Sequence, residues 1–113
     1  KKTLGFLNRS FIEKMKNPFW LINTSRGKVI VTDDLVEGLK TKKILGVGLD
    51  VLEYESNSFN SIINSNEIAP SLEYLIKSDK VLLSPHVAGW TYESHKKLAL
   101  TIVKKIRDLR LTN

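Results

Sequence analysis

Apolar residues in this chain occur both as short uninterrupted runs and as regularly spaced stripes, and the two patterns alternate along the sequence. The runs cover residues 19–22, 44–51 and 81–83. Short apolar runs without polar alternation are typical of strands buried on both faces, as in parallel sheets. We therefore predict three buried strands at these positions.

The spaced stripes predict four helices. One begins after Asn8, a second after Thr32, a short one covers residues 72–76, and the last begins after Thr91. Asn8, Thr32 and Thr91 are N-cap residue types, whose side chains accept bonds from the first free amides of a helix. The last helix has the clearest apolar stripe, while its lysines and Arg107 fall mostly on the other face; the stripe consists of Leu98, Ile102, Val103, Ile106 and Leu109.

Helices that alternate with buried strands are typical of an α/β fold with a parallel sheet and flanking helices. The alternation is interrupted once, between Glu55 and Pro70, where the chain is rich in Asn and Ser. We interpret this stretch as a long polar loop. No internal repeat is present, and the length of 113 residues fits one small domain.

The composition excludes several classes of protein. Hydrophobic residues make up 42% and charged residues 27%, as in soluble globular domains. The chain has no Cys, so disulfides, thiolate nucleophiles and Cys-based zinc sites are excluded, and we predict no metal site. No apolar run approaches the ~20 residues of a membrane helix. The chain does not open with a signal peptide, and we predict a cytoplasmic location with no membrane partner.

The net charge of +6 raises the question of a nucleic-acid partner. The lysines are dispersed over the sequence, and most fall on predicted solvent faces or in turns. We interpret them as a solvated surface and predict no nucleic-acid partner. A basic nucleic-acid-binding domain remains an alternative, which would show a steep salt dependence of DNA affinity.

Polar and ionisable residues follow each predicted strand. Arg26 follows the first strand, Asp50 and Glu55 follow the second, and His86 follows the third. Ligands of doubly wound α/β sheets bind at the carboxyl ends of the strands. A loop arginine or a single histidine is more often a surface residue than a functional one. The convergence of several such groups on one edge of the sheet is what indicates a site.

The chemistry that fits these groups is hydride transfer coupled to proton transfer. His86 has an imidazole that could take the proton of an alcohol, since such groups titrate near neutral pH. Glu55 could orient that ring and stabilise its protonated form. Arg26 offers a planar fork for a carboxylate beside the reacting carbon.

Three segments carry a family resemblance. They are Leu21-Ile22-Asn23-Thr24-Ser25-Arg26-Gly27, then Gly48-Leu49-Asp50-Val51-Leu52-Glu53 with Glu55, and Ser84-Pro85-His86-Val87-Ala88-Gly89-Trp90-Thr91. In this order the motifs resemble the C-terminal signatures of the D-isomer-specific 2-hydroxyacid dehydrogenases. The likeness extends over nearly the whole chain, and it implies a partial Rossmann-like sheet.

The resemblance also implies a role for each matching residue. Arg26, Glu55 and His86 match the family's catalytic residues, with Glu53 as the next candidate for the acid. The positions that match cofactor-binding residues are Thr24, Ser25, Arg26, Asp50, His86, Ala88 and Gly89. The family implies NAD, with NADP not excluded, a small 2-hydroxy or 2-oxo acid substrate, and a homodimer formed through the cofactor domain.

The sequence departs from the family pattern in two ways. The stretch from Glu55 to His86 is longer than the common spacing, and we interpret the polar loop as an insertion. Residues 73–80 together with 86–91 look most like the phosphoglycerate dehydrogenase branch. The glycine motif that receives the pyrophosphate is missing, because Gly46 and Gly48 lie inside a predicted strand, where we interpret them as close-packing positions. We therefore expect residues 1–113 to be the C-terminal part of an NAD-binding domain, without its glycine-rich first half or the substrate domain.

Two functions fit that interpretation. The first is a fragment of an NAD-dependent D-2-hydroxyacid dehydrogenase, inactive when isolated, whose parent enzyme oxidises a 2-hydroxy acid, 3-phosphoglycerate among the candidates. The alternative is an NAD(H)-binding regulatory module of the corepressor type on the same fold. Arg26, Glu55 and His86 do not distinguish the two, whereas an activity assay would.

Overall fold

The computed structural model of the chain describes residues 3–53 and 68–110. Along the chain the elements are α1 (Arg9–Lys14), β1 (Phe19–Asn23), the 3₁₀ turn η1 (Gly27–Val29), α2 (Thr32–Lys40), β2 (Ile44–Leu49), α4 (Pro70–Lys77), β3 (Val81–Leu83) and α5 (Tyr92–Arg110). The alternation of helices and strands expected from the sequence is confirmed. Most of the polar stretch predicted as a loop lies outside the described residues.

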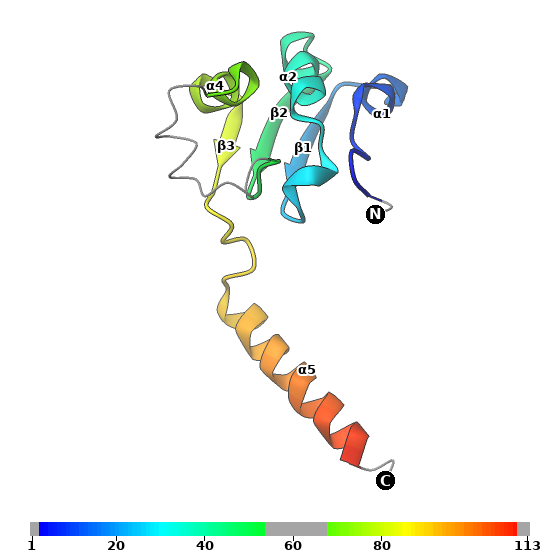
Figure 1. Cartoon of the computed structure of the whole chain (residues 1–113), viewed down its shortest axis with the longest axis vertical. Coiled ribbons are helices and arrows are strands. Elements are labelled where there is room, and N and C mark those ends of the chain that lie inside the picture. The colour runs from blue at the N-terminus through cyan, green and yellow to red at the C-terminus, as the bar shows by residue number, and fades with distance from the viewer. Residues whose placement is uncertain (1–2, 54–67, 111–113) are drawn as a thin grey trace.

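The three strands form one parallel sheet in the order β1-β2-β3. Ile22 of β1 pairs with Gly48 of β2, which pairs in turn with Leu82 of β3. All three strands run in the same direction, so their carboxyl ends lie along one edge of the sheet (Figure 1). Arg26, Asp50 and His86, singled out in the sequence, follow β1, β2 and β3 at this edge.

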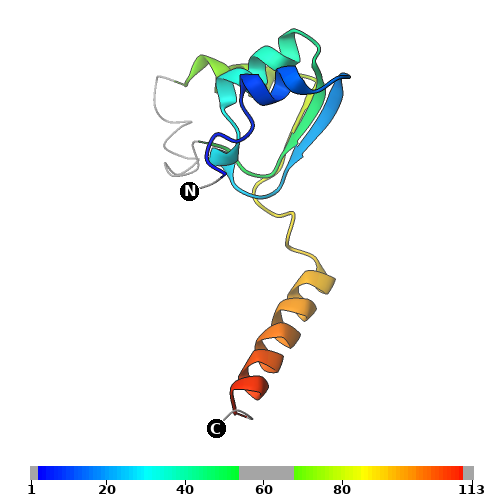
Figure 2. The same cartoon turned by 90° about the vertical axis from the view of Figure 1, so that its right-hand side faces the viewer.

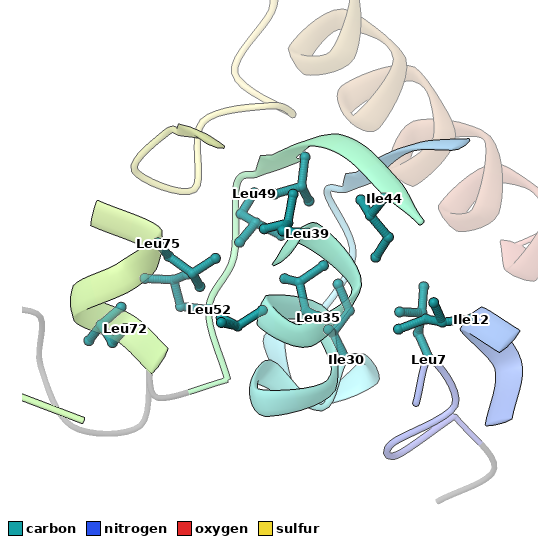
Figure 3. Close-up of a cluster of buried hydrophobic side chains, with 12 residues drawn as sticks. Leu7, Ile12, Ile30, Leu35, Leu39, Ile44, Leu49, Leu52, Leu72 and Leu75 are labelled. Carbon is teal, nitrogen blue, oxygen red and sulfur yellow. The ribbon is translucent and has the colours of Figure 1, made fainter. Parts of the chain in front are cut away.

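One face of the sheet carries the core. Helix α2 packs on β2, with α1 and α4 on either side of it, so the three helices lie on the same side of the sheet (Figure 2). Leu35 and Leu39 of α2, each 1% exposed, belong to the same buried cluster as the fully buried Ile44 of β2. Figure 3 shows these side chains in one cluster with apolar residues of the neighbouring segments. Burial of this stripe fixes α2 against the sheet, because the hydrophobic effect scales with the apolar area removed from water.

The opposite face of the sheet is exposed, so the prediction of strands buried on both faces was wrong. Trp20 and Ile22 of β1 are 73% and 77% exposed, and Leu82 of β3 is 73% exposed. The described helices that pack on the sheet cover only the other face, which is why β1 alternates between exposed and more buried positions. The ring of Trp20 lies over Gly46, where an added Cβ would come within 2.3 Å of it. Gly46 is therefore a close-packing position, as expected, whereas at Gly48 a Cβ would make only an ordinary contact of 3.7 Å.

Helix α5 extends away from the sheet (Figure 1). The side chain of Thr91 accepts the amide of Ser94 at 3.1 Å, which confirms it as the N-cap, just as Asn8 caps α1 by accepting the amide of Phe11. The apolar stripe predicted for α5 is exposed in the structure; Ile102 and Ile106, for example, are 58% and 49% exposed. Within the described parts of the chain, no helix has the length and hydropathy needed to cross a membrane.

Candidate active site

Asp50 joins the ends of β2 and β3. It follows the last residue of β2 and is only 4% exposed. Its carboxylate accepts the hydroxyl of Ser84 at 2.5 Å and the backbone amides of Val87 and Ala88, both at 2.9 Å. Its own amide donates to the carbonyl of Asn23 at the end of β1, at 3.0 Å. Through this one residue, all three strand ends are connected.

These hydrogen bonds keep Asp50 ionised. The hydroxyl of Ser84 is the main reason that the pKa of Asp50 lies below its ordinary value. Burial acts in the opposite direction, while the amides of Ala88 and Val87 and the charge of His86 lower the pKa further. A carboxylate that accepts several hydrogen bonds holds its charge at neutral pH even where water is largely excluded.

His86 lies in the chain between residues that are bonded to the Asp50 carboxylate: Ser84 precedes it, and Val87 and Ala88 follow it. It lies in the segment 84–89 that follows β3, which we call the His86 loop. The side chain is exposed, and the backbone has φ of 56°, in the left-handed region that few non-glycine residues adopt. Its amide donates to the carbonyl of Ser84 at 3.0 Å, and the amides of the next two residues donate to Asp50. This bonding on both sides stabilises a backbone conformation that is otherwise uncommon.

Arg26 lies in a turn that Asn23 organises. The buried amide side chain of Asn23 accepts the amide and the hydroxyl of Ser25, at 3.1 and 3.0 Å, and donates to the carbonyl of Arg26 at 3.1 Å. Asparagine favours such turns because its side chain can replace a backbone partner. Thr24, Ser25 and Arg26 are exposed, and one guanidinium nitrogen of Arg26 donates to the carbonyl of Ser25 at 2.7 Å.

Gly27 allows this turn to approach the chain that follows β2. An added Cβ at Gly27 would lie 1.8 Å from the carbonyl oxygen of Leu52, so no larger residue fits without moving the backbone. The turn that carries Arg26 and the segment after Asp50 are therefore in close contact. This is the local reason for a glycine directly after Arg26.

Glu53 has a structural contact that the sequence did not predict. One oxygen of its carboxylate accepts both the amide of Thr32, at 2.9 Å, and the hydroxyl of Thr32, at 2.7 Å. The prediction that Thr32 caps α2 was wrong, because Thr32 is the first residue of the helix and its hydroxyl donates instead of accepting. A carboxylate from the segment after β2 caps the helix in its place, as favourable interaction with the helix dipole would suggest.

The structure brings together part of the predicted set. Asp50 contacts Ala88 directly and interacts with the charge of His86, while Thr24, Ser25 and Arg26 follow the neighbouring strand at the same edge (Figure 1). Gly89 follows Ala88 in the His86 loop and has open space around it. Glu55 lies outside the described residues. Sequence reasoning missed the positioning roles of Asn23, Ser84 and Glu53, although all three residues lie inside the quoted motifs.

The carboxyl-end edge of the sheet has groups suited to one end of a dinucleotide, but not to its pyrophosphate. The exposed polar groups after β1 and β3 fit the reactive end of NAD, where polar contacts orient a flat ring. The described residues do not fit the pyrophosphate: Gly46 and Gly48 lie within β2, and the N-terminus of α2 is occupied by Glu53. The phosphate site that parallel folds place at a helix N-terminus is therefore not formed by α2.

Comparison with known proteins identifies what the chain resembles. Residues 1–88 match the family model described as "D-isomer specific 2-hydroxyacid dehydrogenase, NAD binding domain". A glyoxylate reductase of Thermofilum pendens is 37% identical over 99 residues, which cover 88% of this chain and 26% of that protein. A D-lactate dehydrogenase of Lactiplantibacillus plantarum is 34% identical over 92 residues, which cover 80% of this chain and 28% of that protein.

Solved structures give the same result for the fold. The NAD-complexed form of a D-isomer specific 2-hydroxyacid dehydrogenase from Lactobacillus delbrueckii ssp. bulgaricus superposes with a TM-score of 0.72 at 30% identity, covering 95% of this chain and 34% of that one. A D-2-hydroxyisocaproate dehydrogenase gives a TM-score of 0.75 at 26% identity, covering 99% and 34%. The chain thus spans about a quarter to a third of the length of these relatives.

Proposed function

The chain belongs to the D-isomer specific 2-hydroxyacid dehydrogenases, within the family of their NAD binding domain, and on this basis we propose that it forms part of an enzyme that interconverts a 2-hydroxy acid and a 2-oxo acid. The observation that carries the proposal is the shared edge at which Arg26, Asp50 and His86 follow three successive strands. An exposed acid–base group and an exposed carboxylate-binding group beside a fixed buried carboxylate suit this chemistry.

The proposal includes a domain assignment. Residues 1–113 correspond to the C-terminal part of the NAD-binding domain, and the glycine-rich half and the substrate domain are supplied from outside these residues. Two observations support this. Gly46 and Gly48 are strand residues, and the chain spans only 26% and 28% of two relatives.

In the oxidation direction, the imidazole of His86 takes the proton of the substrate hydroxyl. The C–H bond of the same carbon breaks, its electron pair leaves as hydride, and the C–O bond becomes a carbonyl. NAD bound at this edge would supply the acceptor for this hydride. In the reduction direction, protonated His86 returns its proton to the carbonyl oxygen. General acid–base assistance of this kind contributes ~10²–10⁴-fold to a rate.

The guanidinium of Arg26 binds the substrate carboxylate. In the structure, one guanidinium nitrogen of this exposed side chain donates to the carbonyl of Ser25 at 2.7 Å. A bidentate pair fixes the orientation of the carboxylate and therefore of the neighbouring carbon. Glu55 is proposed to orient His86 and to stabilise its protonated form.

The remaining predicted residues are proposed to hold the nicotinamide end of NAD. They are Thr24, Ser25, Asp50, Ala88 and Gly89, together with Arg26 and His86. The amide of Ala88 is already bonded to Asp50, so a contact from Ala88 to the carboxamide would use its carbonyl. The described residues give no basis for preferring NADP.

The substrate is proposed to be a small 2-oxo acid and its D-2-hydroxy product. Relatives are named glyoxylate reductase, D-lactate dehydrogenase and aromatic 2-oxoacid reductase, and the carboxylate beside a carbonyl is common to the 2-oxo acids of these reactions. Arg26 would recognise that common part. 3-Phosphoglycerate, suggested by the resemblance of residues 73–80 and 86–91, stays a prediction.

A homodimer formed through the cofactor domain and a cytoplasmic location also stay predictions. The absence of nucleic-acid and membrane partners stays a prediction too, based on the dispersed lysines of the sequence. Sedimentation analysis of the enzyme that carries this chain tests the dimer directly.

The function is tested by incubating the enzyme that carries this chain with NADH and a panel of 2-oxo acids. The panel contains glyoxylate, pyruvate, phenylpyruvate and the 2-oxo acid related to 3-phosphoglycerate. The expected result is NADH consumption with at least one of them and a product of D configuration where the product is chiral. NADH binding without turnover on the whole panel would instead support the regulatory module.

A further inference from the structure

Ser84 lies where β2, Asp50 and His86 meet. It is the first residue after β3, and all three of its polar groups are bonded. Its amide donates to the carbonyl of Leu49 at the end of β2, at 3.0 Å, and its hydroxyl donates to Asp50 at 2.5 Å. Its carbonyl accepts the amide of His86 at 3.0 Å. One half-buried side chain therefore links the buried carboxylate to the start of the His86 loop.

The Asp50 carboxylate, which accepts this hydroxyl, also bonds the two residues that follow His86 in the loop. The oxygen of Asp50 that accepts the hydroxyl of Ser84 accepts the amide of Val87 as well, and the second oxygen accepts the amide of Ala88. His86 lies between these anchors with φ of 56°. A left-handed backbone at a residue other than glycine persists where surrounding contacts over-determine it.

We propose that Ser84 is a positioning residue for His86: its hydroxyl fixes the Asp50 carboxylate, which in turn fixes the backbone on the far side of His86. This inference rests on the proposed function for the part that concerns catalysis. For the part that concerns the structure of the loop, it rests on the contacts alone. Ser84 itself does not touch the substrate.

Removal of the hydroxyl has a defined electrostatic consequence. The hydrogen bond from Ser84 is the main cause of the lowered pKa of Asp50. In the described part of the chain, the charge of His86 also lowers this pKa. Ser84→Ala leaves the carboxylate with its two amide donors, so the pKa of Asp50 rises towards its ordinary value. Ser84→Thr keeps a hydroxyl at the same carbon and is the conservative variant.

The loop is tested by NMR on the 113-residue chain. The amide resonances of Val87 and Ala88 are followed in ¹H–¹⁵N spectra from neutral to acid pH, where they report the protonation of Asp50. In Ser84→Ala the midpoint moves to higher pH and both amide protons shift upfield, as expected for weaker bonds. Ser84→Thr restores both signals, and Ser94→Ala on α5 leaves them unchanged. Amides that behave alike in the wild type and in Ser84→Ala would overturn the proposal.

The catalytic part is tested in the enzyme that carries this chain. Ser84→Ala is expected to lower kcat about 10-fold, the scale of one charge-assisted hydrogen bond, and to shift the acid limb of the pH profile. KM for the 2-oxo acid changes less, because Arg26 and its turn are not altered, and Ser84→Thr recovers activity. An active wild type with an unchanged kcat and pH profile in Ser84→Ala would refute the positioning role. An inactive wild type with the expected NMR result would refute the proposed function while supporting the role of Ser84 in the loop.

Discussion

Glu53 is expected to stabilise the fold and not to take part in catalysis, and a graded pair of substitutions tests this. Its carboxylate accepts two hydrogen bonds from Thr32, which is 6% exposed, so water cannot readily replace the lost acceptor. Glu53→Gln keeps an oxygen acceptor but removes the charge. Glu53→Ala removes the acceptor as well and leaves the amide and hydroxyl of Thr32 without that partner.

The magnitudes follow from the two contacts. Hydrogen bonds to a charged group contribute ~1.5–3 kcal/mol and neutral ones ~0.5–1.5 kcal/mol, so the change to Gln is expected to cost about 1 kcal/mol. Loss of both bonds and of the favourable charge at the helix N-terminus in Glu53→Ala is expected to cost about 2–3 kcal/mol. For a domain of this size, each kcal/mol lowers Tm by roughly 4–8 °C.

The assay is urea and thermal unfolding of the 113-residue chain. Glu37→Gln is the matched control, because Glu37 lies on the same helix with an exposed side chain and should change stability by less than about 0.5 kcal/mol. The expected order is wild type and Glu37→Gln, then Glu53→Gln, then Glu53→Ala. Equal stability of Glu53→Ala and the control would refute the capping role, and Glu53 would again be a candidate for the catalytic acid.

Three further outcomes are expected. Arg26→Lys lowers kcat/KM by about 2–3 kcal/mol in transition-state free energy, because lysine keeps the charge and loses the fork; steady-state kinetics with wild-type values would make Arg26 a surface residue. Because the pKa of Asp50 is lowered in the folded state, its contribution to stability is present at neutral pH and is lost as the pH falls through that lowered value. The difference in unfolding free energy between wild type and Asp50→Asn should therefore shrink in acid, and a constant difference between neutral and acid pH would contradict this. Isothermal titration of the isolated 113-residue chain with NAD should show no tight binding, since α2 has Glu53 at its N-terminus and Gly46 and Gly48 are strand residues; micromolar affinity would show that another segment receives the phosphates.

Local patterns were sufficient to predict the order of the elements. The runs at 19–22, 44–51 and 81–83 gave the strands, and Asn8 and Thr91 cap the helices that follow them. These features depend on residues close in sequence. Because parallel strands end at one edge, the same patterns also indicated where Arg26, Asp50 and His86 would lie.

The contacts that position the site could not be derived in this way. Asp50 and Ser84 are 34 residues apart, and Thr32 and Glu53 are 21 residues apart. A serine after a strand or a glutamate in a loop has no local signal for such a partner. The prediction for Thr32 failed for this reason, since a distant carboxylate displaced its hydroxyl from the capping role.

Burial was the other property that local patterns misjudged. An apolar run shows that a strand has two apolar faces, but not that both are covered within the same chain. Trp20, Ile22 and the stripe of α5 are exposed in the described residues, although their composition is that of a core. The chain spans about a quarter to a third of the length of its relatives, and the domain assignment proposed above would place further elements against these exposed apolar faces.

The central claim is that His86 transfers the proton at this edge, and the most direct measurement compares the two histidines of the chain. His86→Gln and His95→Gln are made in the enzyme that carries this chain, and kcat is measured with the best 2-oxo acid and NADH. His95 is exposed on α5, outside the proposed site, and its replacement is expected to leave kcat unchanged. His86→Gln is expected to lower kcat by ~10²–10⁴-fold, the contribution of general acid–base catalysis. A His86→Gln enzyme that turns over as fast as His95→Gln would contradict the account.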